Sequence, residues 1–137
     1  MTPDADDRTF QPPAANPHAR THRNGVFTVV EVVGEIDLAT AGLVAEHLDA
    51  ATAGLEPDVL VDLRGVDFLD CSGLRVLCRA DNRARERGGR LRVVLDEPRL
   101  RRLLRATGLW DRFPPLSAIP QEPDRSDRLG LPGGEPA

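Results

Sequence analysis

The chain has 137 residues, of which 40% are hydrophobic and 29% charged, as in a soluble globular domain with one core. No apolar run approaches the roughly 20 residues of a membrane-spanning helix, and the acidic, proline-rich N-terminus is unlike a secretory signal. We therefore expect a cytoplasmic protein that does not bind membranes. The net charge of −4 is uneven, because residues 75–112 hold 12 arginines and 5 acidic residues, and this leaves an anionic partner open.

The N-terminal part of the chain predicts a tail followed by a strand. Residues 1–20 carry four prolines and little apolar periodicity, so we expect a disordered tail that at most adds an edge strand near the turn at 23–25. The β-branched, partly alternating residues 26–33 predict a strand. The segment 34–37, Gly-Glu-Ile-Asp, is expected to interrupt that strand.

The middle of the chain predicts two helices around a buried strand. Apolar residues at helical spacing indicate a helix over about 40–53, with Thr40 as its cap. The nearly continuous apolar run 58–63 is typical of a strand covered on both faces. A second helix is expected over about 72–87, ended by two glycines, with a solvated Asp81–Arg85 pair on its surface.

The last elements are a strand, a helix and a short final strand. Residues 91–95 predict the strand, and Asp96-Glu97-Pro98 is a typical start for the helix that follows. Residues 110–113 are interpreted as a last short strand, before a segment rich in proline and glycine. The alternation of strands and helices predicts right-handed crossovers and an α/β sandwich with a small central sheet.

Serine 72 stands between an acid and a glycine in the segment "FLDCSGLRVL", where an expected helix begins. Either Asp70 or Ser72 can cap that helix, but Asp70 can do so alone, which leaves the Ser72 hydroxyl free. Gly73 is interpreted as allowing another protein's backbone to approach. Nucleophilic catalysis fits poorly, because "DCSG" lacks the glycine of a nucleophile elbow and His47 is expected to be solvated in mid-helix.

Phosphorylation of Ser72 is a further hypothesis, beside a purely capping role. A phosphate adds about −1.5 to −2 charges at neutral pH, and the free amides and dipole of a helix N-terminus tolerate such charge. The same charge beside Asp70 would repel an acidic or closely fitting partner. The modification could therefore switch binding and leave the fold intact.

Three segments together resemble the STAS-domain anti-sigma-factor antagonists of bacteria, over roughly residues 24–113. They are "GEIDLATA", "VDLRGVDFLDCSGLRVL" and "GGRLRVV", in this order. The resemblance implies a mixed sheet of four or five strands packed on helices. It places one STAS-like domain at 21–116, with flexible tails at 1–20 and 117–137. The final helix of the family would be short or absent here, around 124–129.

The resemblance also implies a function in stress-responsive transcription. The unmodified protein would bind an ATP-dependent anti-sigma-factor serine kinase and so release a sigma factor. The kinase would phosphorylate Ser72, and a serine phosphatase would restore it. Cys71 stands where many family members have a second hydroxyl residue. Asp37 matches a family acid near the phosphorylation site, although it can equally be a helix cap.

The expected partner-binding residues surround Ser72: Asp37, Thr40, Asp70, Cys71, Gly73, Leu74, Arg75 and Arg79. Arginines at positions 75, 79, 83 and 87 form a stripe along the second helix, which is either a solvated face or a contact surface for acidic groups of the kinase. Nucleic acid is not expected, because the net charge is negative, aromatic residues are few and no binding motif is present.

No metal, cofactor or catalytic activity is expected. Cys71 and Cys78 would lie about 10 Å apart along one helix, too far for a disulfide, and the three histidines have no ligand spacing. Two alternatives to the phosphorylated switch stay open. One is a STAS scaffold or transport-complex subunit that is never phosphorylated, and the other is a nucleotide-binding or weakly hydrolysing protein, for which no glycine-rich phosphate loop is present.

Overall fold

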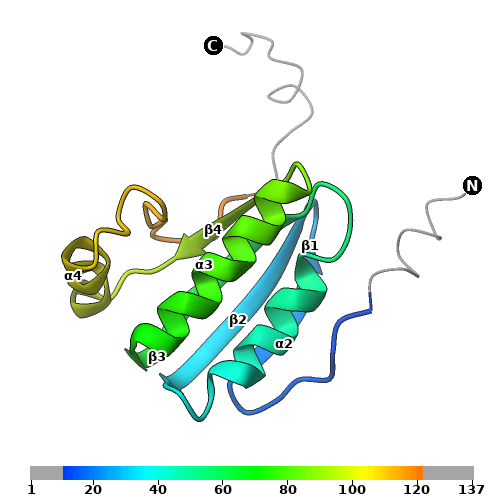
Figure 1. Cartoon of the computed structure of the whole chain (residues 1–137). Coiled ribbons are helices and arrows are strands. Elements are labelled where there is room, and N and C mark those ends of the chain that lie inside the picture. The colour runs from blue at the N-terminus through cyan, green and yellow to red at the C-terminus, as the bar shows by residue number, and fades with distance from the viewer. Residues whose placement is uncertain (1–10, 122–137) are drawn as a thin grey trace, which may run out of the picture.

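The computed structural model describes residues 11–121, which form a four-stranded mixed sheet with two long helices on one face and a shorter helix to the side (Figure 1). The elements in chain order are β1 Ala19–Asn24, β2 Phe27–Ile36, α2 Ala41–Ala51, β3 Asp58–Leu69, α3 Cys71–Glu86, β4 Arg90–Val94 and α4 Pro98–Ala106. The strands are ordered β1-β2-β3-β4. The β1–β2 pair is antiparallel, and the two other pairs are parallel. The expected α/β fold with a mixed sheet is confirmed.

The main core lies between the sheet and the two long helices, α2 and α3, which run side by side over one face (Figure 1). Inward-facing valines and leucines of β2, β3 and β4 pack there against Val44, Leu48, Leu74 and Leu77. A smaller cluster, formed by Phe27, Val29, Leu60 and Val94, lies on the opposite face and is covered by Leu116 and Ile119. The sheet is therefore apolar on both faces near the start of β2.

β2 and β3 are longer than expected, and together they carry the chain to the start of α3. The predicted interruption at 34–37 is wrong, because β2 runs through Gly34 to Ile36. β3 extends to Leu69 in place of ending at 63, and its pairing with β2 shifts register twice. Each shift places one extra residue on β3, as in a β-bulge. The bulges let a long strand continue although its hydrophobic alternation is broken.

The segment after α4 is not the strand that was expected at 110–113 but a series of turns. The Trp110 ring lies 4.1 Å from the Arg105 guanidinium, and Phe113 is buried in the main core. These aromatic residues are used for packing and not for strand pairing. A single parallel bridge, between Val94 and Leu116, returns the chain to the sheet.

The two expected tails are described only in part. The boundary at residue 20 falls inside β1, whose Ala19 is buried, and the Asn16 side chain accepts from the backbone N–H groups of His18 and Ala19. The expected short helix at 124–129 lies outside the described residues. Within residues 11–121, none of the helices combines the length and apolar character that crossing a bilayer requires.

Candidate functional site

Ser72 lies at the edge of the sheet where β2 and β3 end together. Ile36 and Leu69, the last residues of these parallel strands, are register partners, and the Asp70 amide donates to the Ile36 carbonyl at 3.2 Å. Each strand is followed by an aspartate and then by a helix. The β2–α2 junction (residues 37–40) and the β3–α3 junction (residues 70–73) therefore lie next to each other. We call this end of the molecule the Ser72 edge.

The cap of α3 is Asp70 and not Ser72. Asp70 Oδ1 accepts from the Ser72 amide at 2.8 Å, and its carbonyl oxygen accepts from the Leu74 amide at 3.1 Å. The Ser72 side chain is half-buried, and its hydroxyl makes no hydrogen bond within the described part of the chain. The structure thus separates two roles that the sequence left open, because the acid caps the helix and the hydroxyl stays free.

Gly73 and Leu74 face the core. A Cβ atom on Gly73 would lie 3.1 Å from Ile36 Cγ2 and closer still to Leu69 Cδ1. The absence of a side chain therefore lets α3 pack against the ends of β2 and β3. This corrects the interpretation that Gly73 makes room for another protein, since both Gly73 and Leu74 are buried.

The β2–α2 junction is closed by a ring of hydrogen bonds. Asp37 Oδ1 accepts from the amides of Ala39 and Thr40, at 2.9 and 3.2 Å. The Thr40 hydroxyl accepts from the Asp37 amide and donates to the Glu35 carbonyl oxygen, both at 2.9 Å. Thr40 is at the cap position of α2, but its hydroxyl bonds no amide of that helix. Asp37 thus stabilises the loop of the junction that adjoins the one holding Ser72.

Leu38, at the tip of this loop, was not singled out from the sequence. Its side chain is 82% exposed although it is large and apolar. A leucine in a chain segment between two core residues, Ile36 and Val44, would ordinarily be expected in the core as well. It faces solvent here because of the loop conformation that the hydrogen bonds of Asp37 and Thr40 fix. The sequence therefore carried no signal for it.

The arginine stripe of α3 divides into two parts. Arg83 Nη1 pairs with Asp49 Oδ1 of α2 at 2.6 Å. Arg75 and Arg79, which follow Ser72, are exposed and form no ion pair with any described residue. Arg87 is also exposed and has no ion pair among the described residues, but it caps the opposite end of α3. Arg75 and Arg79 are therefore the unpaired arginines of the stripe that lie toward the Ser72 edge.

The expected Asp81–Arg85 pair exists, but it is not a solvated pair. Arg85 Nε is 3.2 Å from Asp81 Oδ2, while Asp81 itself is only 2% exposed. The closer partner is Arg112, whose Nε donates to Asp81 Oδ2 at 2.7 Å and whose Nη2 donates to the Cys78 carbonyl oxygen at 2.9 Å. Arg112 fastens the segment after α4 to the middle of α3.

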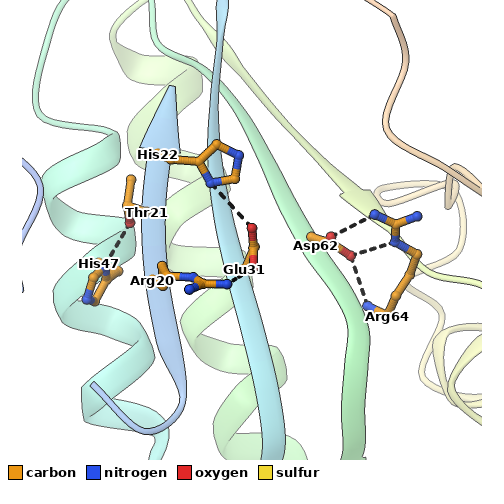
Figure 2. A network of polar contacts seen from close by, with 7 residues as sticks. All are labelled: Arg20, Thr21, His22, Glu31, His47, Asp62 and Arg64. Carbon is orange, nitrogen blue, oxygen red and sulfur yellow. Dashed lines mark hydrogen bonds and ion pairs between the residues drawn. The ribbon is translucent and has the colours of Figure 1, made fainter. Parts of the chain in front are cut away.

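His47 is fully buried, so the prediction that it is solvated is wrong. One ring nitrogen, Nε2, is 3.1 Å from the Ala14 carbonyl oxygen, to which it donates, and Nδ1 is 2.7 Å from the Thr21 hydroxyl (Figure 2). Both nitrogens are engaged in holding residues 14–21 against α2. His47 is therefore a structural residue and does not serve as a base for Ser72.

The two cysteines are not disulfide-bonded; Cys71 is exposed and Cys78 half-buried. In residues 11–121, no three or more histidine, cysteine, aspartate or glutamate side chains are grouped so that they could hold a metal ion.

A polar row crosses the sheet face that lies opposite α2 and α3 (Figure 2). Glu31 pairs with Arg20 at 3.1 Å and with His22 at 3.4 Å, and Asp62 pairs with Arg64 at 2.9 Å. Partial burial alone would raise the pKa of Asp62, but hydrogen bonds from Arg64 and its positive charge outweigh that effect, so the pKa lies below its ordinary value.

Comparison with known proteins gives a consistent set of relatives. A family model described as STAS domain matches residues 18–122. Anti-sigma-F factor antagonist RsfA of Mycobacterium tuberculosis is 30% identical over 110 residues, which cover 77% of this chain and 85% of that protein. An anti-sigma F factor antagonist of Paenibacillus polymyxa is 30% identical over 94 residues, covering 68% of this chain and 80% of that protein. The crystal structure of an anti-sigma factor antagonist from Mycobacterium paratuberculosis is similar, with a TM-score of 0.68 and 28% identity; the match covers 80% of this chain and 92% of that chain.

Proposed function

Because the chain belongs to the STAS-domain family, we propose that it is an anti-sigma-factor antagonist whose binding is switched by phosphorylation of Ser72. In its unmodified form it binds an anti-sigma factor that is also a serine kinase, and the sigma factor is released. Phosphorylation of Ser72 ends this binding, and a serine phosphatase restores it. The protein is a binding module and catalyses no reaction itself. The names of its relatives support the antagonist role.

The observation that carries the proposal is the free hydroxyl of Ser72. Asp70 already caps α3, so the hydroxyl has no structural task to give up when it is modified. The Ser72 side chain is partly accessible and lies in the first turn of α3. The free N–H groups of such a turn can donate hydrogen bonds to an anion. A phosphate there is compatible with the fold.

Electrostatics supports a switch of binding. Arg75 and Arg79 make the unmodified surface attractive to an acidic partner. A phosphate on Ser72 adds about −1.5 to −2 charges to the same helix face, in which Ser72 and Arg75 are neighbours at a spacing of three residues. The phosphate therefore offsets the positive charge of Arg75 and Arg79 and weakens the attraction for an acidic partner.

The site residues divide into supporting and contacting groups in this proposal. Asp37, Thr40 and Asp70 fix the two junctions through backbone hydrogen bonds, and the buried Gly73 and Leu74 seat α3 on the strand ends. The contacting side chains are Ser72 itself and the exposed Cys71, Arg75 and Arg79.

Phosphorylation by purified anti-sigma-factor kinases of the source organism tests the proposal. With ATP, one of them should add a single phosphate to the protein, located at Ser72 by mass spectrometry. Ser72→Ala should abolish the modification, whereas Ser117→Ala, which removes another exposed hydroxyl, should not. Ser72→Asp should weaken kinase binding while circular dichroism stays as in the wild type. Full phosphorylation of Ser72→Ala would refute the site, and binding without phosphorylation by any kinase would instead support a scaffold.

A further inference from the structure

Three of the large apolar side chains that are exposed in the described residues belong to the last parts of β2 and β3 or to the loop after β2, and one of them, Leu38, is in the Ser72 edge itself. Four such side chains are exposed in the described residues: Val33, Leu38, Leu55 and Phe68. Val33, Leu38 and Phe68 lie in or directly after the last parts of β2 and β3, where Phe68 is the register partner of Glu35. Leu55 alone lies at the opposite end, in the loop that precedes β3. Single exposed apolar residues are common on protein surfaces, so an interaction surface is indicated only where further features accompany one, as they do at Leu38.

Leu38 is the most exposed of the three, and its loop is held in one conformation. The amides of Asp37, Ala39 and Thr40 all have acceptors inside the loop, and the Ala41 amide donates to the Asp37 carbonyl oxygen at 2.8 Å. The leucine is thus presented to solvent on a preorganised turn. Preorganisation lowers the conformational entropy that is lost on binding. A few anchoring side chains usually carry most of the affinity of an interface, and a side chain on a rigid turn suits that role.

Charge around Leu38 indicates the chemistry of its partner. The β2–α2 junction lies against the β3–α3 junction through the Asp70–Ile36 hydrogen bond, and α3 then presents Arg75 and Arg79 with no ion-pair partner among the described residues. Asp37 and Asp70 are half-buried, and their carboxylates accept backbone amides. The surface is therefore apolar at Leu38 and cationic along α3, while the exposed carboxylates of Glu35 and Asp67 lie on the other side of Leu38, in the last parts of β2 and β3.

We propose that Leu38 anchors the contact with the anti-sigma-factor kinase, in an apolar socket of the kinase rimmed by carboxylates that face Arg75 and Arg79. This inference rests on the proposed function and adds the residue that carries the affinity. It also gives the phosphate a second effect. A phosphate on Ser72 would have to be desolvated at the rim of an apolar socket, in addition to repelling the carboxylates.

Titration calorimetry with each purified anti-sigma-factor kinase of the source organism tests the anchor, with Leu55 as the matched control because it is 89% exposed at the opposite edge. For the kinase that binds the wild type, Leu38→Ala should weaken the affinity by about tenfold or more. Leu38→Met should retain most of the wild-type affinity, because its side chain is similar in size and also apolar. The affinity of Leu55→Ala should stay within about twofold of that of the wild type. Thermal unfolding should be unchanged in all three variants, because both side chains are exposed.

The outcomes separate this inference from the function on which it rests. Wild-type affinity for Leu38→Ala would overturn the anchor and leave the antagonist function standing. Equal losses for Leu38→Ala and Leu55→Ala would also overturn it, because they would indicate nonspecific apolar adhesion. If the wild type binds none of the kinases, the proposed function fails, and the anchor fails with it.

Discussion

The two strand-to-helix junctions at the Ser72 edge are built alike but use their hydroxyl residues differently. In both, an aspartate follows the strand and accepts the amide two residues ahead, Ala39 from Asp37 and Ser72 from Asp70. In the first junction a hydroxyl three residues after the aspartate, that of Thr40, closes the loop. In the second the hydroxyl is two residues after it, and it bonds to no described group.

A difference of one residue in the spacing from the aspartate accompanies the difference in role: the Thr40 hydroxyl is hydrogen-bonded, and the Ser72 hydroxyl is free. Thr40 is placed so that its oxygen reaches back to the end of β2. Ser72 is already in the first turn of α3, and its amide, not its side chain, is what Asp70 engages. Removing the Thr40 hydroxyl should therefore affect the fold, whereas changing the Ser72 hydroxyl should affect only the surface.

Two glycines in the first turns of α2 and α3, Gly42 and Gly73, should give the largest contrast in stability. Gly73→Ala places a Cβ against Leu69 and Ile36, and overpacking of this kind costs about 1–3 kcal/mol. Gly42→Ala, in the first turn of α2, meets open space and should stabilise the protein by up to about 1 kcal/mol through helix propensity. Urea unfolding measures both. A neutral Gly73→Ala would mean that the close contact relaxes without cost.

The hydroxyls themselves should differ by a smaller amount. Thr40→Val removes two hydrogen bonds within the β2–α2 junction and should lower the free energy of unfolding by about 1–2 kcal/mol. Ser72→Ala should change it by less than about 0.5 kcal/mol. Chemical denaturation of the two variants is the measurement. Equal losses would show that the Ser72 hydroxyl has a structural role after all.

A third aspartate, Asp62, gives the smallest effect and isolates the contribution of charge. It makes the same type of turn, since its Oδ1 accepts from the Arg64 amide at 3.1 Å, but it also pairs with the Arg64 guanidinium. The pKa of Asp62 is lower in the folded protein than its ordinary value of 3.8. The ionised carboxylate therefore stabilises the fold fully at pH values above the unfolded-state pKa, and this stabilisation is lost as the pH falls through the lower folded-state pKa.

Asp62→Asn should accordingly destabilise the protein at pH 7 by about 0.2–1 kcal/mol. The difference from the wild type should narrow in acid, once the carboxyl of the wild type is protonated. Unfolding free energies measured from pH 7 down to acid pH check this. A difference that stays constant with pH would assign the effect to the turn and not to the charge.

The sequence predicted the elements in which apolar spacing is regular. The three helices and the strands rich in valine and leucine were expected close to their observed positions, because burial on one or both faces imposes a period. β1 was expected only as an optional edge strand. Its polar side chains lie partly on the open face, so its composition resembles that of a loop. Bulges similarly hid the length of β3.

Contacts between segments that are distant in sequence were not predictable. His47 was misjudged because its partners, Thr21 and the Ala14 carbonyl, lie in the part of the chain taken for a tail and its edge. Asp81 has a near neighbour in sequence, Arg85, but its burial depends on Arg112. At the site, Ser72 and its capping acid could be identified locally. The exposure of Leu38 and the burial of Gly73 depend on how two junctions meet.

The close seating of Gly73 against Ile36 and Leu69 limits what a modification of its neighbour can do. The first turn of α3 is packed closely on the ends of the two strands, so under the proposed mechanism we expect a group added at Ser72 to leave the shape of the domain unchanged. Under the proposed mechanism, no slow rearrangement delays the response. The speed of signalling is then set by the enzymes that add and remove the phosphate. The partner distinguishes two surfaces that have the same shape and differ in the charge and bulk of one group.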